Sequence, residues 1–333
     1  MSKKFPIIAI TGSSGSGTTT VRQSFQHIFN REKINATVIE GDSYHRYERA
    51  EMDALIKQHD LVPGVNFSHF GPEANILDEL ANTFETFGKT GKCKTRKYIH
   101  SDDEGRPYNQ KAGTMTPWEG AESDILFYEG LHGGYVGDDA DVARHVDLLV
   151  GVVPIINLEW IQKLHRDKKM RGYSSEAVID TILNRMPDYI HHICPQFSRT
   201  HINFQRVPTV DTSNPFIAKD IPSPDESMLV IRFADPAGVD LQYLLSMLHG
   251  SMITRPNTIV VPGVKINCKA KLIFPPGTTI VLGRVIIEPC SMLSKYCKST
   301  PSGSAKRITN ILSSGLGISF AMNGLDVSTV GTR

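Results

Sequence analysis

The feature that most constrains the fold is a glycine-rich loop placed directly after a short apolar run. The run Ile7–Ile10 is followed by the sequence GSSGSGTT over residues 12–19, and then by a segment whose apolar residues recur at helical spacing. This order of strand, glycine-rich loop and helix is the context of a Walker A loop, where main-chain N–H groups and the helix dipole bind phosphates. The residues expected at the phosphates of a nucleotide are Gly12, Ser13, Ser14, Gly15, Ser16, Gly17, Thr18, Thr19 and Thr20.

This loop departs from the Walker pattern at one position. Thr18 stands where the pattern has lysine, while Thr19 keeps the hydroxyl that contacts Mg²⁺. Stabilising charge on the transferred group is most of phosphoryl-transfer catalysis, so the missing positive charge must come from elsewhere in the chain. The alternative interpretation is a plain Gly/Ser-rich turn, which the flanking strand and helix disfavour.

Composition narrows the class of protein. The 333 residues carry 36 Lys and Arg against 35 Asp and Glu, so the net charge of +1 disfavours nucleic-acid binding. No apolar run is long enough to cross a membrane, and the run after Lys4 is too short for a signal peptide. Five cysteines without CxxC spacing predict reduced thiols. We therefore expect a cytoplasmic protein that binds neither nucleic acid nor a membrane.

Apolar runs alternate with helical patterns through the first two-thirds of the chain, which predicts a doubly wound α/β fold with a mostly parallel sheet. The expected strands are Phe5–Thr11, Ala36–Glu40, Asp124–Tyr128, Leu148–Pro154 and Met228–Phe233. The expected helices are Thr19–Arg31, Glu73–Phe87, Asn157–Met170 and Ser175–His191. Thr95–Gly120 interrupts the alternation and predicts an inserted hairpin or lid. Residues 1–263 are expected to form one domain, and residues 264–333 an irregular, poorly ordered C-terminal tail with one short hairpin.

An acid follows the second expected strand, at the edge of the sheet where α/β proteins bind ligands. Asp42, His45 and Arg49 would share one face if this segment were helical. A carboxylate beside these cations suits an acceptor site, with a base for a hydroxyl and positive charge for a phosphate already on the substrate. A helix-capping aspartate before a solvated helix face is the alternative.

Two further segments carry candidate groups. Glu129 ends an apolar strand, the position of a Walker B acid that holds Mg²⁺, although a solvated strand end is also possible. On the helix expected over residues 157–170, Lys163, Asp167 and Arg171 recur every four residues with Arg166 beside them. This helix is the best candidate for the missing cation; a solvated charged face is the alternative.

Taken together, these residues resemble the phosphoribulokinases of the proteobacterial type over residues 1 to about 263. The resemblance rests on GSSGSGTTT at 12–20, IEGD at 39–42, FSHF at 67–70, FYEGLHG at 127–133, NLEWIQK at 157–163, HRD at 165–167 and VDTSNPF at 210–216. It implies a P-loop kinase fold and transfer of the γ-phosphoryl of ATP, with Mg²⁺, to the 1-hydroxyl of ribulose 5-phosphate. Threonine in place of the Walker lysine is itself a mark of this branch.

The resemblance also implies residue roles. Asp42 matches the catalytic base, Asp167 a second essential carboxylate, Lys163 a residue for ATP and transition-state charge, and Glu129 the metal-binding acid. The implied substrate contacts are Arg31, His45, Arg49, His100, Arg166 and Arg171. Family members of this type are oligomers, typically octamers, activated by NADH and inhibited by AMP, and the positions matching the effector site are Arg185, Arg232 and Arg255.

Two alternatives remain at this point. A kinase of the same branch that acts on uridine or pantothenate would normally keep the Walker lysine. A regulatory nucleotide switch would not need the cluster around Asp42. Ser16 stands where plant-type relatives have a regulatory cysteine, which disfavours redox control, and the tail after Val264 departs from the helical end usual in the family.

Overall fold

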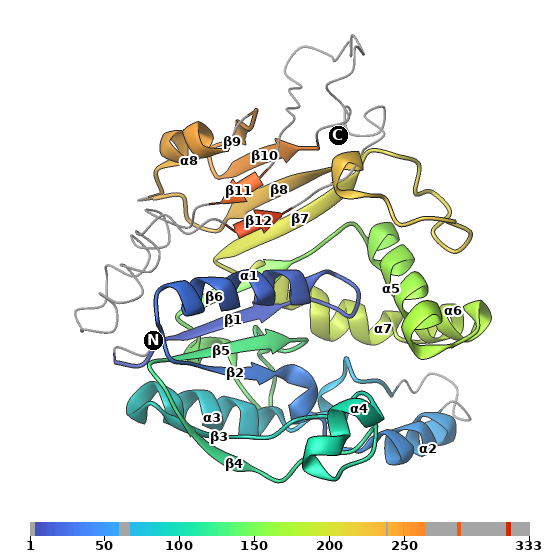
Figure 1. Cartoon of the computed structure of the whole chain (residues 1–333). Helices are drawn as coiled ribbons and strands as arrows, with labels where there is room; N and C mark the ends of the chain where they lie inside the picture. The colour runs from blue at the N-terminus through green and yellow to red at the C-terminus, as the bar shows by residue number, and fades with distance from the viewer. Residues whose placement is uncertain are drawn as a thin grey trace.

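The computed structural model describes residues 4–59, 67–237, 239–248, 250–263, 285–287 and 318–320. Its centre is an eight-stranded sheet in the order β2-β5-β1-β6-β7-β8-β10-β9 (Figure 1). The parallel strands are β1 Ile7–Thr11, β2 Ala36–Glu40, β5 Ile125–Gly130, β6 Leu148–Val152 and β7 Ile202–Pro208. The predicted α/β class is confirmed, and the ends of β1, β2 and β5 meet at one edge of the sheet.

The other end of the sheet is antiparallel, which corrects one prediction. β8 Ser227–Phe233 was expected among the parallel strands, but it pairs antiparallel with β7 and with β10 Thr258–Pro262, beyond which lies β9 Met252–Arg255. A parallel pair needs a crossover, usually a helix, whereas the connection between β7 and β8, residues 209–226, has only the short 3₁₀ turn Pro224–Glu226 as regular structure. Strand β7 itself was not predicted, because its partly alternating residues give a weaker signal than a continuous apolar run.

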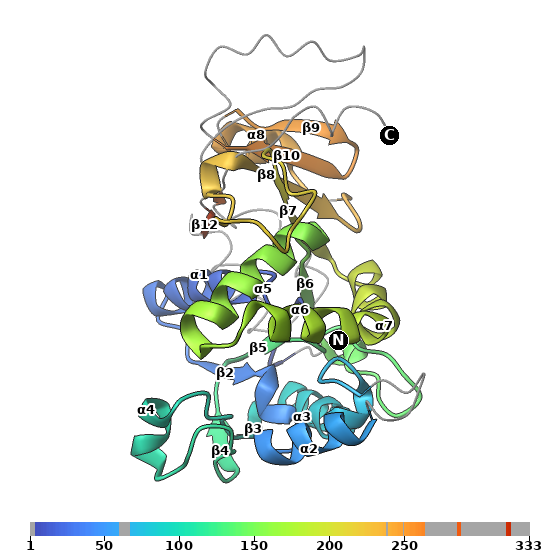
Figure 2. The same cartoon turned by 90° about the vertical axis from the view of Figure 1, so that its right-hand side faces the viewer.

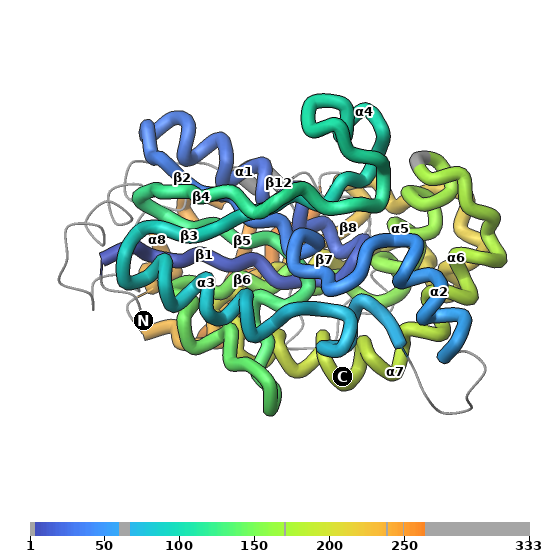
Figure 3. The backbone as a smooth tube through the Cα atoms, turned by 90° about the horizontal axis from the view of Figure 1, so that it is seen from below, coloured from blue at the N-terminus to red at the C-terminus, as the bar shows by residue number. Residues whose placement is uncertain are grey.

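Helices cover both faces of the parallel part of the sheet (Figures 1 and 3). Ile8 and Ile10 of β1 face α1 Thr18–Arg31, whose apolar stripe includes Phe25. The alternate residues Ile7 and Ala9 join the opposite core under α3 Leu77–Thr90. The central strand is therefore apolar on both sides, as a buried parallel strand requires, and its end is held rigidly where the phosphate loop begins.

The remaining helices agree with the predictions to different degrees. α2 Arg49–His59 and α8 Leu241–Met247 were not predicted, whereas α5 Ile156–Arg171 agrees closely with prediction. The helix expected over 175–191 is α6 Ser175–Asn184, followed by α7 Met186–Asp188, a π turn Tyr189–Ile193 and a 3₁₀ turn Cys194–Ser198. Pro187 lacks the N–H that a continuous helix would use. The helix predicted from Glu73 starts at Leu77, because Pro72–Ala74 forms a 3₁₀ turn. α5 and α6 pack against each other beside the sheet (Figure 2).

The predicted insertion is a hairpin. β3 Lys92–Thr95 and β4 Glu119–Glu122 pair antiparallel, with α4 Asp102–Gly105 and the 3₁₀ turn Arg106–Tyr108 between them. Arg96 ties the hairpin to the segment after β2 through bonds from Nε to the carbonyl of Ser43 at 2.7 Å and from Nη2 to that of His45 at 2.8 Å. The prediction for the tail falls outside the described residues, except for β11 Val285–Ile287 and β12 Ile318–Phe320, which pair antiparallel.

Candidate active site

The phosphate loop follows β1 as predicted, and α1 begins at Thr18. Gly15 and Gly17 have φ of +104° and +102°, a region that residues with a Cβ rarely adopt. The N–H of Gly12 donates to the carbonyl of Gly130 at 3.2 Å, which joins the loop to the end of β5. The buried hydroxyl of Ser16 has no hydrogen-bond partner among the described residues. The loop is thus a compact turn at a helix N-terminus, the geometry that binds phosphate.

One face of α5 packs directly on this loop. Glu159 accepts a hydrogen bond from the hydroxyl of Ser13, and Gln162 Nε2 donates to the carbonyl of Gly15 at 2.5 Å. A Cβ at Gly15 would lie 3.0 Å from the carbonyl oxygen of Glu159 and 3.2 Å from Cβ of Lys163. Only glycine allows this approach, and it brings Lys163 beside the loop that lacks its own lysine.

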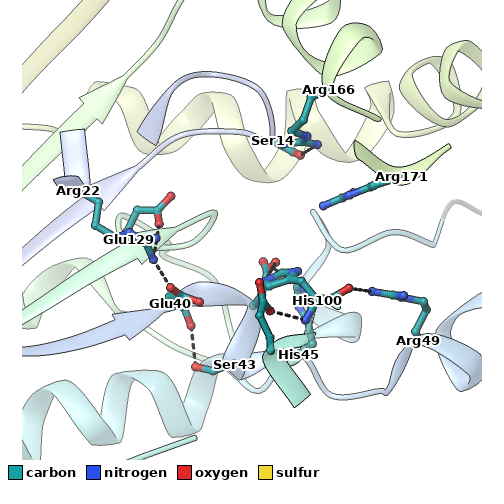
Figure 4. Close-up of polar contacts among 12 residues, drawn as sticks. Ser14, Arg22, Glu40, Ser43, His45, Arg49, His100, Glu129, Arg166 and Arg171 are labelled. Carbon is teal, nitrogen blue, oxygen red and sulfur yellow. Dashed lines mark hydrogen bonds and ion pairs between the residues drawn. The ribbon is translucent and has the colours of Figure 1, made fainter. Parts of the chain in front are cut away.

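The cations of α5 surround one buried carboxylate. Lys163 Nζ lies 2.6 Å from Asp167 Oδ2, while Arg166 Nη2 and Arg171 Nη1 lie 2.8 and 3.4 Å from Oδ1. Arg166 Nη2 also donates to the hydroxyl of Ser14 at 2.8 Å (Figure 4). The side chains of Lys163 and Asp167 are only 7% and 3% exposed, so this part of the helix is not a solvated charged face.

Burial shifts the pKa values of two charged groups on α5 that lie beside the loop, Lys163 and Glu159. Desolvation and, second, the nearby charge of Arg185 together lower the pKa of Lys163 to about 8, although the charge of Asp167 and its hydrogen bond act in the opposite direction. Desolvation raises the pKa of Glu159 to about 7, although bonds from Ser13 and Tyr189 favour its charged form. Sequence reasoning missed Glu159; the available signal was its position four residues before Lys163, on the same helical face.

The acceptor cluster forms, but not on one helix face as predicted. Asp42 lies in a 3₁₀ turn, Gly41–Tyr44, His45 is extended, and Arg49 begins α2. The turn still brings His45 Nε2 within 3.4 Å of Asp42 Oδ1, and the hairpin brings His100 Nε2 within 3.7 Å of Oδ2. Arg49 Nη2 donates to the carbonyl of His100 at 3.3 Å (Figure 4). Residues from three elements therefore meet around the carboxylate.

The surroundings of Asp42 favour the ionised form of its carboxyl group. Its side chain is 39% exposed. Burial alone would raise its pKa, but the pKa lies far below the usual range because the electrostatic interaction and the hydrogen bond with His45 outweigh that effect, with a smaller contribution from His100. A carboxylate flanked by cationic groups can accept a proton from a hydroxyl while those groups bind an anion.

The carboxylates at the ends of β2 and β5 form the third part of the site. Glu129 is 13% exposed on its side chain, with Oε2 3.7 Å from Nη1 of Arg22, and Arg22 also pairs with Glu40. The hydroxyl of Thr18 bonds to Glu129, and desolvation raises the pKa of this acid. Glu129 is therefore not a solvated strand end. The exposed Thr19 stands at the start of α1, and Arg22 was missed although it lies one helical turn after Thr18.

These oxygen donors suit Mg²⁺, which prefers carboxylate, hydroxyl and phosphate oxygens. Among the described residues, no group of three or more His, Cys, Asp or Glu side chains could hold a metal ion by itself. The site therefore suits an ion that takes only one or two protein ligands and completes its coordination shell with phosphates and water, as Mg²⁺ does.

Arg185 links the two halves of the site. This half-buried residue at the end of α6 interacts electrostatically with Asp167 and with Asp42, and burial lowers its pKa. Figure 4 shows Arg166 and Arg171 facing His45, His100 and Arg49. The phosphate loop, α5 and the Asp42 cluster therefore share one site.

Three predicted contacts lie elsewhere. Arg31 ends α1, about 20 Å along the helix from the phosphate loop, and contacts Glu32. Arg232 on β8 and Arg255 on β9 are exposed, and both align with Thr258 of β10. Strands β8 and β9 lie away from α6, the helix that precedes Arg185 (Figures 1 and 2). Two of the three expected effector residues therefore lie near each other on neighbouring strands, whereas the third, Arg185, interacts with Asp167 and Asp42 of the candidate site.

A Walker-type loop, an acid at the end of the neighbouring strand and cations from a packed helix define this protein as a P-loop phosphotransferase. A sequence profile of the phosphoribulokinase / uridine kinase family matches residues 7–213. The chain belongs to this family.

Individual relatives agree over most of the chain. It is 61% identical over 278 residues to the chromosomal phosphoribulokinase of Cupriavidus necator, covering 83% of this chain and 95% of that protein. It is 59% identical to the phosphoribulokinase of Sinorhizobium medicae, with 83% and 96% covered. The solved phosphoribulokinase from Rhodobacter spheroides superposes with a TM-score of 0.72 at 53% identity, covering 79% of this chain and 91% of that one.

Two other observations bear on the predictions. Cys93 and Cys194, the cysteines within the described residues, are free thiols, as predicted. None of the helices in the described part of the chain has the length and apolar character to cross a membrane.

Proposed function

We propose that this protein transfers the γ-phosphoryl group of ATP to the 1-hydroxyl of D-ribulose 5-phosphate, forming the bisphosphate that accepts CO₂ in the Calvin cycle. The observation that carries the proposal is the meeting of the Asp42 cluster with the phosphate loop and α5 in one site, linked by Arg185. The high identity to phosphoribulokinases supports the choice of substrate over uridine or pantothenate. A pure nucleotide switch would not need a base and cations on the acceptor side.

The proposed roles follow from position. Asp42 accepts the proton of the attacking hydroxyl as the new O–P bond forms and the bond between the γ-phosphorus and ADP breaks, with the electron pair leaving on ADP. His45, Arg49, His100 and Arg171 lie where they can bind the sugar phosphate. Lys163 and Arg166, held beside Gly15 and Ser14, replace the Walker lysine at the γ-phosphoryl group.

Mg²⁺ would be held by Glu129 and Thr19 together with the phosphates of ATP. When bound, it neutralises charge on the β- and γ-phosphates. Thr18 and Arg22 orient the Glu129 carboxylate toward this position.

Regulation and assembly are part of the same proposal. The resemblance supports NADH activation and AMP inhibition through Arg185, Arg232 and Arg255, a homo-oligomer of up to eight chains, and a cytoplasmic location. A coupled assay with and without NADH or AMP, together with light scattering, tests these points directly.

The test of function is turnover of ATP with ribulose 5-phosphate, uridine and pantothenate in parallel, with the product identified by phosphorus NMR. We expect turnover of ribulose 5-phosphate alone, and turnover of uridine alone would overturn the proposal. Asp42→Asn should lower kcat by roughly 10²–10⁴, the usual contribution of a general base. Asp78→Asn, at an exposed acid in the first turn of α3, is the matched control and should retain activity.

A further inference from the structure

Both ring nitrogens of His45 face a polar group. Nδ1 lies 2.9 Å from Oδ1 of Asn75, and Nε2 lies 3.4 Å from Oδ1 of Asp42. The ring is buried and stacks on His69 with centroids 4.0 Å apart. Turning the ring over would place carbon atoms opposite both oxygens, so these contacts define its orientation.

The side-chain amide of Asn75 also has one orientation. Its Nδ2 donates to the carbonyls of Gly71 at 2.7 Å and His69 at 3.0 Å. Asn75 is only 1% exposed, and its backbone N–H donates to Pro72 while its carbonyl accepts from Arg46. A flipped amide would set its oxygen against two carbonyl oxygens. The oxygen that faces His45 is therefore the acceptor, and the N–H of that contact must belong to Nδ1 of His45.

A neutral histidine has only one N–H. Because Asn75 holds it at Nδ1, the neutral ring presents a lone pair from Nε2 toward Asp42. Two electron-rich atoms then face each other, whereas the doubly protonated ring donates from Nε2. The charge on His45 thus decides whether the acceptor side of the site offers a donor or a repulsive lone pair.

We propose that Asn75 is a positioning residue that keeps the single N–H of the neutral His45 ring at Nδ1. As a result, His45 can donate from Nε2 only when the ring carries both protons. The proposal rests on the proposed function for its readout, because the anion that Nε2 would bind beside Asp42 is the sugar phosphate. Binding of ribulose 5-phosphate is then coupled to protonation of His45 and weakens as the pH rises. Without Asn75, a neutral ring can move its proton to Nε2 and keep the donor.

Other ionisable groups surround the His45 ring, and their charges also influence how substrate binding depends on pH. Those near it or its backbone are Asp42 and His100 on the acceptor side, His69 stacked on it, His132 within electrostatic reach, Tyr98 at its edge and Arg96 at its carbonyl. All of them remain in the Asn75→Ala variant, so a comparison of variant and wild type isolates the effect of the amide.

The experiment measures KM for ribulose 5-phosphate against pH, from about pH 5 to about pH 8, for wild type and Asn75→Ala. The ionisation of the substrate's own phosphate is common to both and cancels in their ratio. We expect the ratio of wild-type to variant KM to rise with pH, by up to about tenfold per unit once the wild-type ring is neutral. KM for ATP should show no such trend. A ratio that does not change with pH would overturn the proposal.

Asn82→Ala on α3 is the matched control, because the one hydrogen bond that this exposed amide makes within the described residues is to Glu79, at 3.5 Å. It should behave as wild type. If Asn75→Ala does not fold, wild-type protein labelled with ¹⁵N-histidine, with His45 assigned by comparison with His45→Gln, still decides the question. Neutral His45 must be protonated at Nδ1, and protonation at Nε2 would overturn the proposal. This NMR measurement needs no turnover, so a wrong substrate assignment is distinguished from a wrong role for Asn75.

Discussion

Replacing Lys163 by methionine tests how this protein acts without a Walker lysine. Methionine keeps most of the aliphatic stem that packs against Gly15 and removes the charge. If Lys163 stabilises charge that develops on the transferred group, its loss should lower kcat by about 10²–10³, the effect of removing one preorganised donor, or about 3–4 kcal/mol. KM for ribulose 5-phosphate should change by less than about threefold, because the interaction is made mainly in the transition state.

The fold should survive this substitution. Asp167 loses its closest partner, but Arg166 and Arg171 remain 2.8 and 3.4 Å from its other oxygen. A buried charge left without any partner costs about 3–5 kcal/mol, so we expect a smaller loss of unfolding free energy here. A chemical denaturation curve measures it and separates lost catalysis from lost structure.

The assay is ADP release at saturating ATP and ribulose 5-phosphate. Lys168→Met, at an exposed lysine of the same helix, is the matched control and should leave kcat within about twofold of wild type. Because the pKa of Lys163 is about 8, wild-type kcat/KM for ATP should fall as the pH rises above that value, and this fall should vanish in Lys163→Met. A variant whose kcat stays within tenfold of wild type would refute the reasoning and move the role to Arg166 or Arg171.

Two further predictions concern groups near the phosphate loop and Asp42. Burial raises the pKa of Glu159 from 4.5 to about 7, so the folded protein binds the extra proton and loses up to about 3 kcal/mol of unfolding free energy as the pH rises through this range. In Glu159→Gln this loss should disappear, and melting curves at pH 5 and pH 8 that still differ as in wild type would contradict the assignment. Gly41→Ala would place a Cβ 2.6 Å from Oη of Tyr128 and 2.8 Å from Cα of Gly130, displacing the turn that carries Asp42. We expect a loss of about 1–3 kcal/mol in stability together with lower kcat, whereas Gly120→Ala, with no atom within 4 Å, should be silent in both measurements.

Prediction from sequence worked where the signal is local. The strand, loop and helix around residues 7–31 follow from a glycine-rich turn between two apolar patterns, and each pattern depends on residues within a few positions of one another. The same holds for the face of α5 that carries Lys163 and Asp167, because helical periodicity places residues four apart side by side. The missing lysine at position 18 then made α5 the expected source of positive charge.

The sequence by itself therefore determined the phosphate loop, the identity of the cationic helix and the acids at the strand ends. Only the tertiary structure decided that Ser13 meets Glu159 across 146 positions of sequence, that Arg185 joins the active site and that β8 runs antiparallel. It also replaced the expected helix at Asp42 by a turn in which Asn75 holds His45. The physical reason is range: periodicity and turn chemistry act between neighbours in the chain, whereas these contacts depend on how the sheet and its helices pack.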